Sequence, residues 1–286
     1  MKKKSSLMTH IAGSPYIVWA VLFIIVPLCM VAYYAFTDKS GNFTFDNMLS
    51  IGKYTDTIIL SIWLGLLATV ISLVVAYPLA MIMASKGPEK QSRMTMLIML
   101  PMWMNFLLRT YSWMTILEDN GLLTSGLNFI VESINNLSGL SLEPIHLINT
   151  RGAVVLGMVY NFLPYMILPI YTVMLKADHS LVEAAQDLGG NKLDVFRNVT
   201  IPLSVPGIVS GFTMVFVPSV STFFISQKLG GTGTTLIGDI IETQFQTANN
   251  FHLGASLSFV LMILIFICLA VMNKFSDDEE DGGMLM

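Results

Sequence analysis

Residues 180–202 read SLVEAAQDLGGNKLDVFRNVTIP, a charged stretch that separates two long apolar runs. The run before it is GAVVLGMVYNFLPYMILPIYTVML (152–175), and the run after it is SVPGIVSGFTMVFVPSVSTFFIS (204–226). Each run is long enough to cross the hydrocarbon core of a bilayer as a helix, which takes about 20 residues. The sequence therefore predicts a polar segment that is held at both ends by membrane helices.

The composition of the whole chain also indicates a membrane protein. Of its 286 residues, 54% are hydrophobic and 12% are charged, whereas a soluble domain carries about 25% charged residues. Backbone groups inside lipid must be hydrogen-bonded within the chain, so continuous apolar runs form helices. We predict an all-α polytopic membrane protein, a single transmembrane domain over 1–286 with six transmembrane helices. The spans are expected near 15–36, 57–83, 94–117, 152–175, 204–226 and 254–273.

The distribution of Lys and Arg predicts the orientation, because cytosolic loops are enriched in these residues. With the N-terminus inside, ten of them fall in cytosolic segments and four in outer segments. We therefore expect both termini and the stretch 180–202 to face the cytosol. The four outer basic residues are Lys39, Lys53, Arg151 and Lys228.

The charged stretch reads locally as two helices joined by a tight turn. Ser180 followed by Glu183 is the pattern of a capping box, which predicts that a first helix begins there and runs to about Leu188. Gly189 and Gly190 are expected to end it, because glycine tolerates the left-handed conformation common at helix C-termini. One apolar face of this helix is formed by Leu181, Ala185 and Leu188.

A second short helix is expected to begin at Asn191, a favourable N-cap residue, and to be stopped by Pro202. The stretch 180–202 is then an amphipathic helical hairpin. The pattern leaves two roles open: the hairpin docks on a partner protein, or it lies along the membrane surface.

The hairpin resembles the EAA motif of ABC-importer permeases. The family usually has Ile and Leu where Val199 and Ile201 stand, which is a conservative difference. The resemblance implies a type I ABC importer permease fold, in which the hairpin is the helix that docks on a cytosolic ATPase. The positions that it assigns to ATPase coupling are Glu183, Ala184, Ala185, Gly189 and Pro202.

Four longer segments are similar to the PotB-type permeases of spermidine/putrescine ABC importers. They are 101–117, 157–178, 183–211 and 236–245. This resemblance implies polyamine uptake across a bacterial inner membrane with three partners: a second, PotC-like permease, a PotA-like ATPase dimer that holds ATP and Mg, and an extracytoplasmic PotD-like polyamine-binding protein. No cofactor is expected in this chain and no nucleic acid among its partners. The alternatives are an ABC permease for another small solute, and a secondary transporter.

Enzyme chemistry finds no support in the sequence. The four histidines are scattered, and neither an H-E-x-x-H nor a G-x-S-x-G motif is present. GGTGTT (230–235) lacks the Gly-Lys-Ser/Thr ending of a phosphate-binding loop. We therefore predict no catalytic residue, no metal site and no ATP site in this chain.

A polyamine path through this subunit must be built from neutral groups, because the six spans contain no Asp or Glu. Amides and aromatic faces can receive ammonium groups. Packing inside the protein or at the membrane interface is the alternative role for each aromatic residue. The candidates are Trp103, Asn105, Tyr111, Tyr160, Asn161, Tyr165, Phe223 and Phe224.

The six predicted spans contain one charged residue, Arg109. Burying an arginine in the hydrocarbon core costs about 3 kcal/mol or more. We expect Arg109 to form a salt bridge with Glu118 or Asp119, or with the partner permease; a gating role is the alternative.

The outer segments hold nine acids, which we expect to attract cations weakly. They are Asp38, Asp46, Asp56, Glu118, Asp119, Glu132, Glu143, Asp239 and Glu242.

Overall fold

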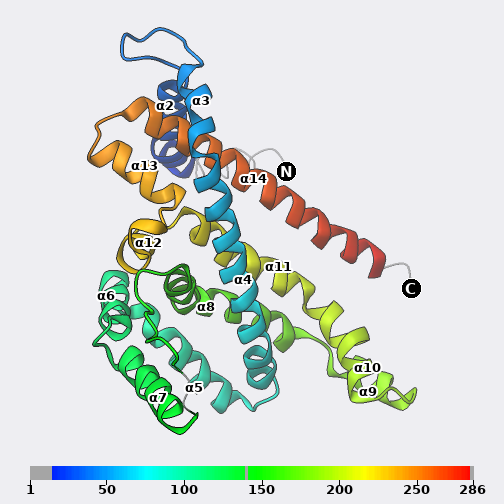
Figure 1. Ribbon diagram of the computed structural model, residues 1–286. Helices are drawn as coiled ribbons and strands as arrows, with labels where there is room; N and C mark the ends of the chain where they lie inside the picture. Colours follow the sequence, from blue (N-terminus) through cyan, green and yellow to red (C-terminus); the bar gives the residue numbers. More distant parts are fainter. Residues whose placement is uncertain (1–14, 139–140, 284–286) are drawn as a thin grey trace, which may run out of the picture. The chain divides into compact units, whose positions relative to one another are not determined.

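The computed structural model describes residues 15–138 and 141–283, and most of these residues are helical (Figure 1). This confirms the all-α class. The α-helices after residue 20 are α2 (Val26–Ala35), α3 (Asp46–Ser50), α4 (Thr55–Ala84), α5 (Pro88–Met99), α6 (Phe106–Leu117), α7 (Leu122–Ser138), α8 (Arg151–Lys176), α9 (His179–Asp187), α10 (Lys192–Val195), α11 (Ile201–Ser221), α12 (Phe224–Leu229), α13 (Ile237–Gln246) and α14 (Phe251–Gly283). Short π or 3-10 turns are η1 (Val21–Ile25), η2 (Ile51–Tyr54), η3 (Leu100–Trp103), η4 (Phe196–Thr200) and η5 (Gly231–Gly233).

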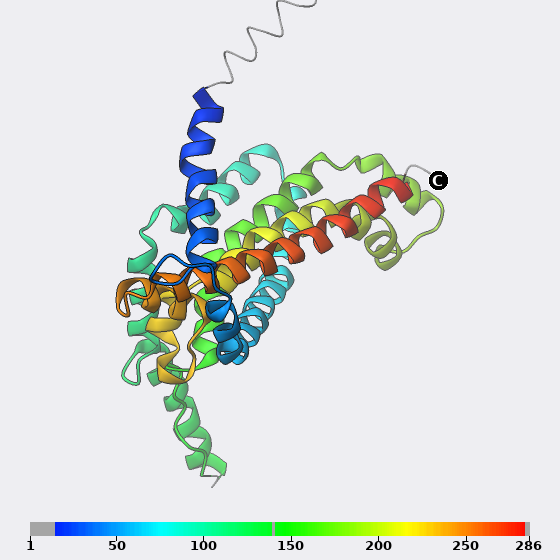
Figure 2. The same ribbon diagram turned by 90° about the horizontal axis from the view of Figure 1, so that it is seen from above.

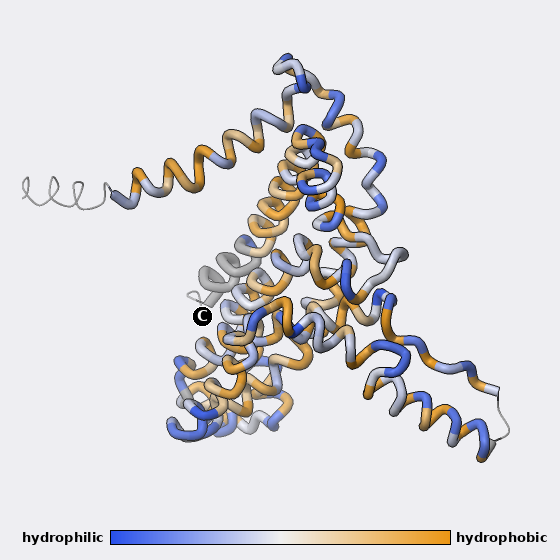
Figure 3. The backbone as a smooth tube through the Cα atoms, turned by 90° about the vertical axis from the view of Figure 1, so that its left-hand side faces the viewer, coloured by the Kyte–Doolittle hydropathy of each residue, from blue (hydrophilic) through white to orange (hydrophobic). Residues whose placement is uncertain are grey.

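Five helices of the described chain are long and apolar enough to cross a bilayer. In Figure 3 the long helices are coloured mainly as hydrophobic and the connecting segments mainly as hydrophilic. These helices correspond to five of the six predicted spans, with shifted ends. They are Pro15–Ala35, Asp46–Ala84, Arg151–Lys176, Lys192–Ser221 and Phe251–Met272.

The remaining predicted span, 94–117, is not one continuous helix, so this prediction was wrong. α5 ends at Met99, η3 follows, and α6 begins at Phe106. Pro101 causes the break, because it has no N–H to donate and its ring clashes with the carbonyl four residues earlier. Asn105 starts the new helix: its side chain accepts a hydrogen bond from the Leu107 N–H at 2.8 Å.

The fifth predicted span, 204–226, also differs from the observed helix. α11 ends at Ser221, Thr222 has an extended backbone, and α12 begins at Phe224. The start of α13 lies directly against this break, because a Cβ added to Gly238 would come 2.5 Å from the Thr222 carbonyl oxygen.

The described chain forms two compact units. The first contains residues up to Thr55 together with Ile240–Leu264. Within it, the Ser256 hydroxyl donates to the Ala35 carbonyl at 3.0 Å, and the Phe36 and Phe259 rings meet edge to face. The second unit contains Asp56–Asp239 and the chain from Ile265 onward, and it holds the hairpin and both helix breaks.

The most extensive helix packing in the second unit is between α8 and α11, which run side by side (Figure 1). Gly207 and Gly211 of α11 face α8 with the G-x-x-x-G spacing that lets membrane helices approach closely. A Cβ on Gly207 would lie 2.9 Å from the Ile170 Cα and 3.0 Å from the Pro169 oxygen. A Cβ on Gly211 would lie 3.1 Å from the Met166 oxygen. Backbone therefore meets backbone along this pair.

We expect Gly207→Ala to lower the stability of the protein by about 1–3 kcal/mol, because the backbone of Pro169 and Ile170 cannot move aside as a side chain could. Gly126→Ala is the matched control: a Cβ there meets nothing within 4 Å, and Ala favours the helix by about 1 kcal/mol. Thermal unfolding of both variants in detergent checks this. An unfolding midpoint of Gly207→Ala at or above that of the natural chain would contradict the close packing.

Candidate functional site

The first helix of the hairpin, α9, is capped by Asp178. Its carboxylate accepts a hydrogen bond from the Ser180 N–H at 2.9 Å. The predicted capping box of Ser180 and Glu183 was therefore wrong, because the acid two residues before Ser180 takes the N-cap position and the helix begins at His179. Glu183 is left with an exposed side chain on the first turns of α9.

The turn of the hairpin agrees with the prediction. Gly189 has φ +85°, a conformation that residues with a Cβ rarely adopt. Its N–H donates to the Gln186 carbonyl at 2.9 Å, and the Gly190 N–H donates to the Ala185 carbonyl at 3.0 Å. These bonds satisfy carbonyls that the end of α9 leaves without helical partners.

The start of the second hairpin helix also agrees with the prediction. The Asn191 side chain accepts from the N–H groups of Leu193 and Asp194, at 2.8 and 3.0 Å. The Asp194 carboxylate accepts from the Asn191 N–H at 3.1 Å, which completes a capping box. The turn between α9 and α10 is thus fixed by hydrogen bonds on both sides.

Pro202 does not stop the second helix, so this prediction was wrong. The chain stays helical from Lys192 to Ser221 through the π turn η4. In η4 the Ile201 N–H donates to the Phe196 carbonyl, five residues earlier. The wider turn removes the clash between the proline ring and the preceding helical turn, and Pro202 then sits in the first turn of α11. Another π turn, η1, precedes Pro27.

The hairpin exposes leucines as well as charges. Leu188, at its turn, is 90% exposed, and Leu181 and Leu193 are also exposed. Val195 is buried, so α10 does pack against its neighbours. Large exposed apolar patches with a polar rim often mark binding surfaces, and these leucines give the hairpin apolar area that a partner could cover.

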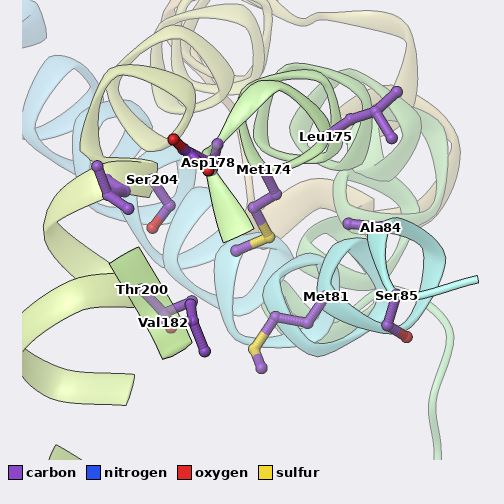
Figure 4. A pocket seen from close by; sticks show the side chains of 11 residues that line it. Met81, Ala84, Ser85, Met174, Leu175, Asp178, Val182, Thr200 and Ser204 are labelled. Carbon is purple, nitrogen blue, oxygen red and sulfur yellow. The ribbon is translucent and has the colours of Figure 1, made fainter. Parts of the chain in front are cut away.

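A cavity of about 340 Å³ lies at the root of the hairpin, where the C-terminal ends of α4 and α8 meet α9 and α11 (Figure 4). Ser204 stands on its wall, with its hydroxyl 3.0 Å from the Tyr77 hydroxyl. The cavity is lined by Met81, Ala84, Ser85, Met174, Leu175, Ala177, Asp178, Val182, Thr200, Leu203 and Ser204.

The two helix breaks lie next to each other at the opposite end of α11 from the hairpin, because α6 packs on α12. Figure 2 shows this separation within the second unit. Three rings join the two broken segments: the Phe224 centroid lies 6.1 Å from that of Phe106 and 5.7 Å from that of Tyr111. We call Phe106, Tyr111 and Phe224 the aromatic cluster. Many transporters bind substrate where membrane helices are discontinuous.

Four of the predicted path residues lie at these breaks. Trp103 is 72% exposed, and Phe223 is exposed beside Phe224. Asn105 has the local role of capping α6. The breaks therefore bring together residues from the third and fifth predicted spans.

The three predicted path residues on α8 have different surroundings. Tyr160 meets Trp113 edge to face at 5.3 Å and lines an apolar groove of about 620 Å³ between α4 and α8. Asn161 is 2% exposed; its amide donates to the Gly157 carbonyl at 2.9 Å, and its buried oxygen has no hydrogen-bond partner among the described residues. Tyr165 is exposed elsewhere on the helix. Their part in a substrate path stays a prediction.

Arg109 is 8% exposed, and its guanidinium carbon lies 6.0 Å from the centroid of the Phe106 ring. Its buried Nε and Nη1 have no hydrogen-bond partner among the described residues. The predicted salt bridge to Glu118 or Asp119 was wrong: Asp119 lies 2.8 Å from the His146 ring, and Glu118 terminates α6. The alternative partner, an acceptor on the second permease, stays a prediction.

Sequence reasoning missed the roles of two residues near the breaks. Asp239, predicted as an outer acid that attracts cations, is buried, and it accepts hydrogen bonds from the Ser226 hydroxyl and the Leu236 N–H. That prediction was wrong, because the carboxylate fixes the start of α13 on α12. Lys228 places its ammonium over two aromatic rings. Its spacing of four residues from Phe224 on one helix was the available signal.

The fold and the EAA-type hairpin define a permease subunit of an ABC importer. The chain belongs to the family described as binding-protein-dependent transport system inner membrane component, which matches residues 76–277. It is therefore a multi-pass inner-membrane permease subunit rather than an enzyme, as predicted.

The curated relatives include spermidine/putrescine transport system permease proteins PotB, which confirms the resemblance to the PotB type. The chain is 33% identical to PotB of Escherichia coli over 261 residues, covering 88% of this chain and 92% of the relative. It is 32% identical to PotB of Haemophilus influenzae, covering 88% of each chain. The crystal structure of a bacterial ABC transporter for alginate import has the same fold, with a TM-score of 0.73, 15% identity and 96% of each chain covered.

Replacing Arg109 by Met should raise the thermal midpoint of the isolated chain in detergent, because leaving buried donors unpaired costs about 1–3 kcal/mol. The same change should lower recovery of the second permease in co-purification, since it removes the group that would receive that partner's acceptor. Arg93→Met is the control: Arg93 is exposed in a surface pair with Glu89, and such pairs contribute about 0–1 kcal/mol. Unchanged recovery with Arg109→Met would rule out the contact between subunits.

Proposed function

We propose that this chain is the transmembrane permease subunit of an ATP-driven importer of spermidine and/or putrescine. The observation that carries this proposal is the 32–33% identity to PotB permeases over nearly the whole length of both chains. The EAA-type hairpin and the fold of an ABC importer permease agree with it.

The proposed complex contains three kinds of partner. A second, PotC-like permease completes the membrane pathway, a PotA-like ATPase dimer holds ATP and Mg, and a PotD-like binding protein delivers the polyamine from outside. The family description, which specifies dependence on a binding protein, supports the last of these. Exposed large side chains on the broken third span, such as Trp103 and Leu108, offer apolar surface to the second permease.

Coupling in this proposal begins at the hairpin. The ATPase binds α9 through Glu183, Ala184 and Ala185, with the exposed Leu188 at the edge of the contact. When the ATPase dimer closes, the hairpin shifts into the space of the cavity at its root. Gly189 keeps the turn tight, and Pro202 with its π turn holds the junction to α11 in a fixed shape.

The motion then reaches the helix breaks through α8 and α11. These helices move as one body, because their backbones are in contact at Gly207 and Gly211. The other end of α11 is the break at Thr222, which lies beside α6 and the aromatic cluster. A shift of the hairpin therefore changes the separation of the two broken segments.

The substrate path in this proposal passes the helix breaks. Trp103, Phe223 and Phe224 offer ring faces, and the broken turns free backbone carbonyls, both of which can receive ammonium groups. Both termini and the hairpin face the cytosol in this arrangement, as the distribution of Lys and Arg favours.

We expect Leu188→Asp to reduce ATP-dependent uptake roughly tenfold or more, because it places an unpaired charge in the apolar part of the contact, where binding removes water. Its exposure predicts an intact fold. Leu137→Asp is the matched control, because Leu137 is 89% exposed on α7, away from the hairpin. The measurement is transport by membranes that contain equal amounts of each variant. Full transport by Leu188→Asp would exclude the hairpin as the docking site.

The substrate is tested by uptake of labelled spermidine in cells that depend on this importer, in competition with unlabelled putrescine and with solutes of other classes. We expect spermidine or putrescine to compete, and uptake to stop when the partner ATPase is removed. Competition by a different solute alone would refute the polyamine assignment. Uptake that survives loss of the ATPase would indicate a secondary transporter.

A further inference from the structure

The ammonium group of Lys228 lies between two rings of the aromatic cluster. Its Nζ is 5.4 Å from the centroid of Tyr111 and 5.7 Å from the centroid of Phe224. The two rings are 5.7 Å apart at 83° to each other, so they form two walls of a corner. Tyr111 comes from the broken third span, and Phe224 and Lys228 come from the segment after the break in the fifth.

These rings hold the ammonium by cation–π attraction, which is the way aromatic cages recognise alkylammonium ligands. Among the described residues, no carboxylate lies within ion-pair distance of Lys228. The contact is therefore between a cation and ring faces, without a counter-charge.

The side chain that occupies this corner has the chemistry of the proposed substrate. A lysine side chain is four methylene groups ending in a primary ammonium, which is the same unit as the aminobutyl end of putrescine or spermidine. A site that accepts one accepts the other by the same contacts.

We propose that Tyr111 and Phe224 form an ammonium subsite of the transport path and that the Lys228 side chain occupies it as a tethered competitor until a polyamine displaces it. This inference rests on the proposed function. It assigns a role to a cation that would otherwise only repel the substrate from the path.

The surroundings allow Lys228 to leave while the rings stay. Phe224 is followed by the buried Ile225 and Ser226, and the Ser226 hydroxyl donates to the Asp239 carboxylate at 2.9 Å. α12 is thereby anchored at the ring end. Lys228 lies in its last turn and is partly exposed, so its side chain can swing away by rotation about its own bonds.

The test uses the importer purified with its partner subunits, and it measures equilibrium binding of labelled spermidine without the binding protein. We expect Lys228→Met to bind spermidine roughly three- to tenfold more tightly, the effect of removing one cation–π competitor. The control Lys53→Met, at an exposed lysine of another segment, should leave binding unchanged. In a chain that also carries Tyr111→Leu, Lys228→Met should not increase the affinity for spermidine, because one ring of the subsite has been removed.

A second measurement uses the natural chain without any substitution. It therefore tests the inference even if one of the variants does not fold. Acetylation of Lys228 in the natural chain, with the reagent in large excess over all amines including those of spermidine, should be slow and should accelerate when spermidine is added; mass spectrometry measures it. An importer that takes up spermidine but shows equal or weaker binding by Lys228→Met, or acetylation that spermidine does not change, overturns the inference alone. An importer whose natural chain takes up no polyamine overturns the proposed function and the inference with it.

Discussion

Gly207 and Gly211 bring the backbone of α11 against the backbone of α8, and this contact ties the two ends of the second unit together. The hairpin projects from one end of the pair, and the break at Thr222 lies at the other. Side chains between two helices could absorb a displacement by changing rotamers, whereas touching backbones cannot. The contact therefore connects the surface that we propose to meet the ATPase with the region where the membrane helices are interrupted.

The features that the sequence predicted correctly are those set by neighbouring residues. Gly189 and Asn191 behave as expected because a positive φ and a capping box involve residues within a few positions along the chain. The apolar runs predict most spans for the same reason. Ser180 was misread because Asp178, two residues earlier, is an equally good N-cap residue, and the sequence alone does not show which of the two begins the helix.

The features that the sequence did not predict depend on contacts across the fold or on geometry that one pattern cannot specify. Pro202 was expected to stop a helix, but a π turn accommodates it. Asp239 looked like a surface acid until the fold placed Ser226 beside it. The corner of Tyr111 and Phe224 requires two broken helices to meet, and no spacing within either segment encodes that meeting.

The central claim is that the hairpin binds an ATPase and that α8 and α11 transmit the movement of the ATPase to the helix breaks. Site-specific crosslinking from Ala184, an exposed small residue on α9, tests it most directly in the assembled complex. The account predicts a crosslinked product that contains the ATPase subunit and whose yield changes when ATP is added. Crosslinks that reach lipid alone, with the ATPase present and active, would contradict it.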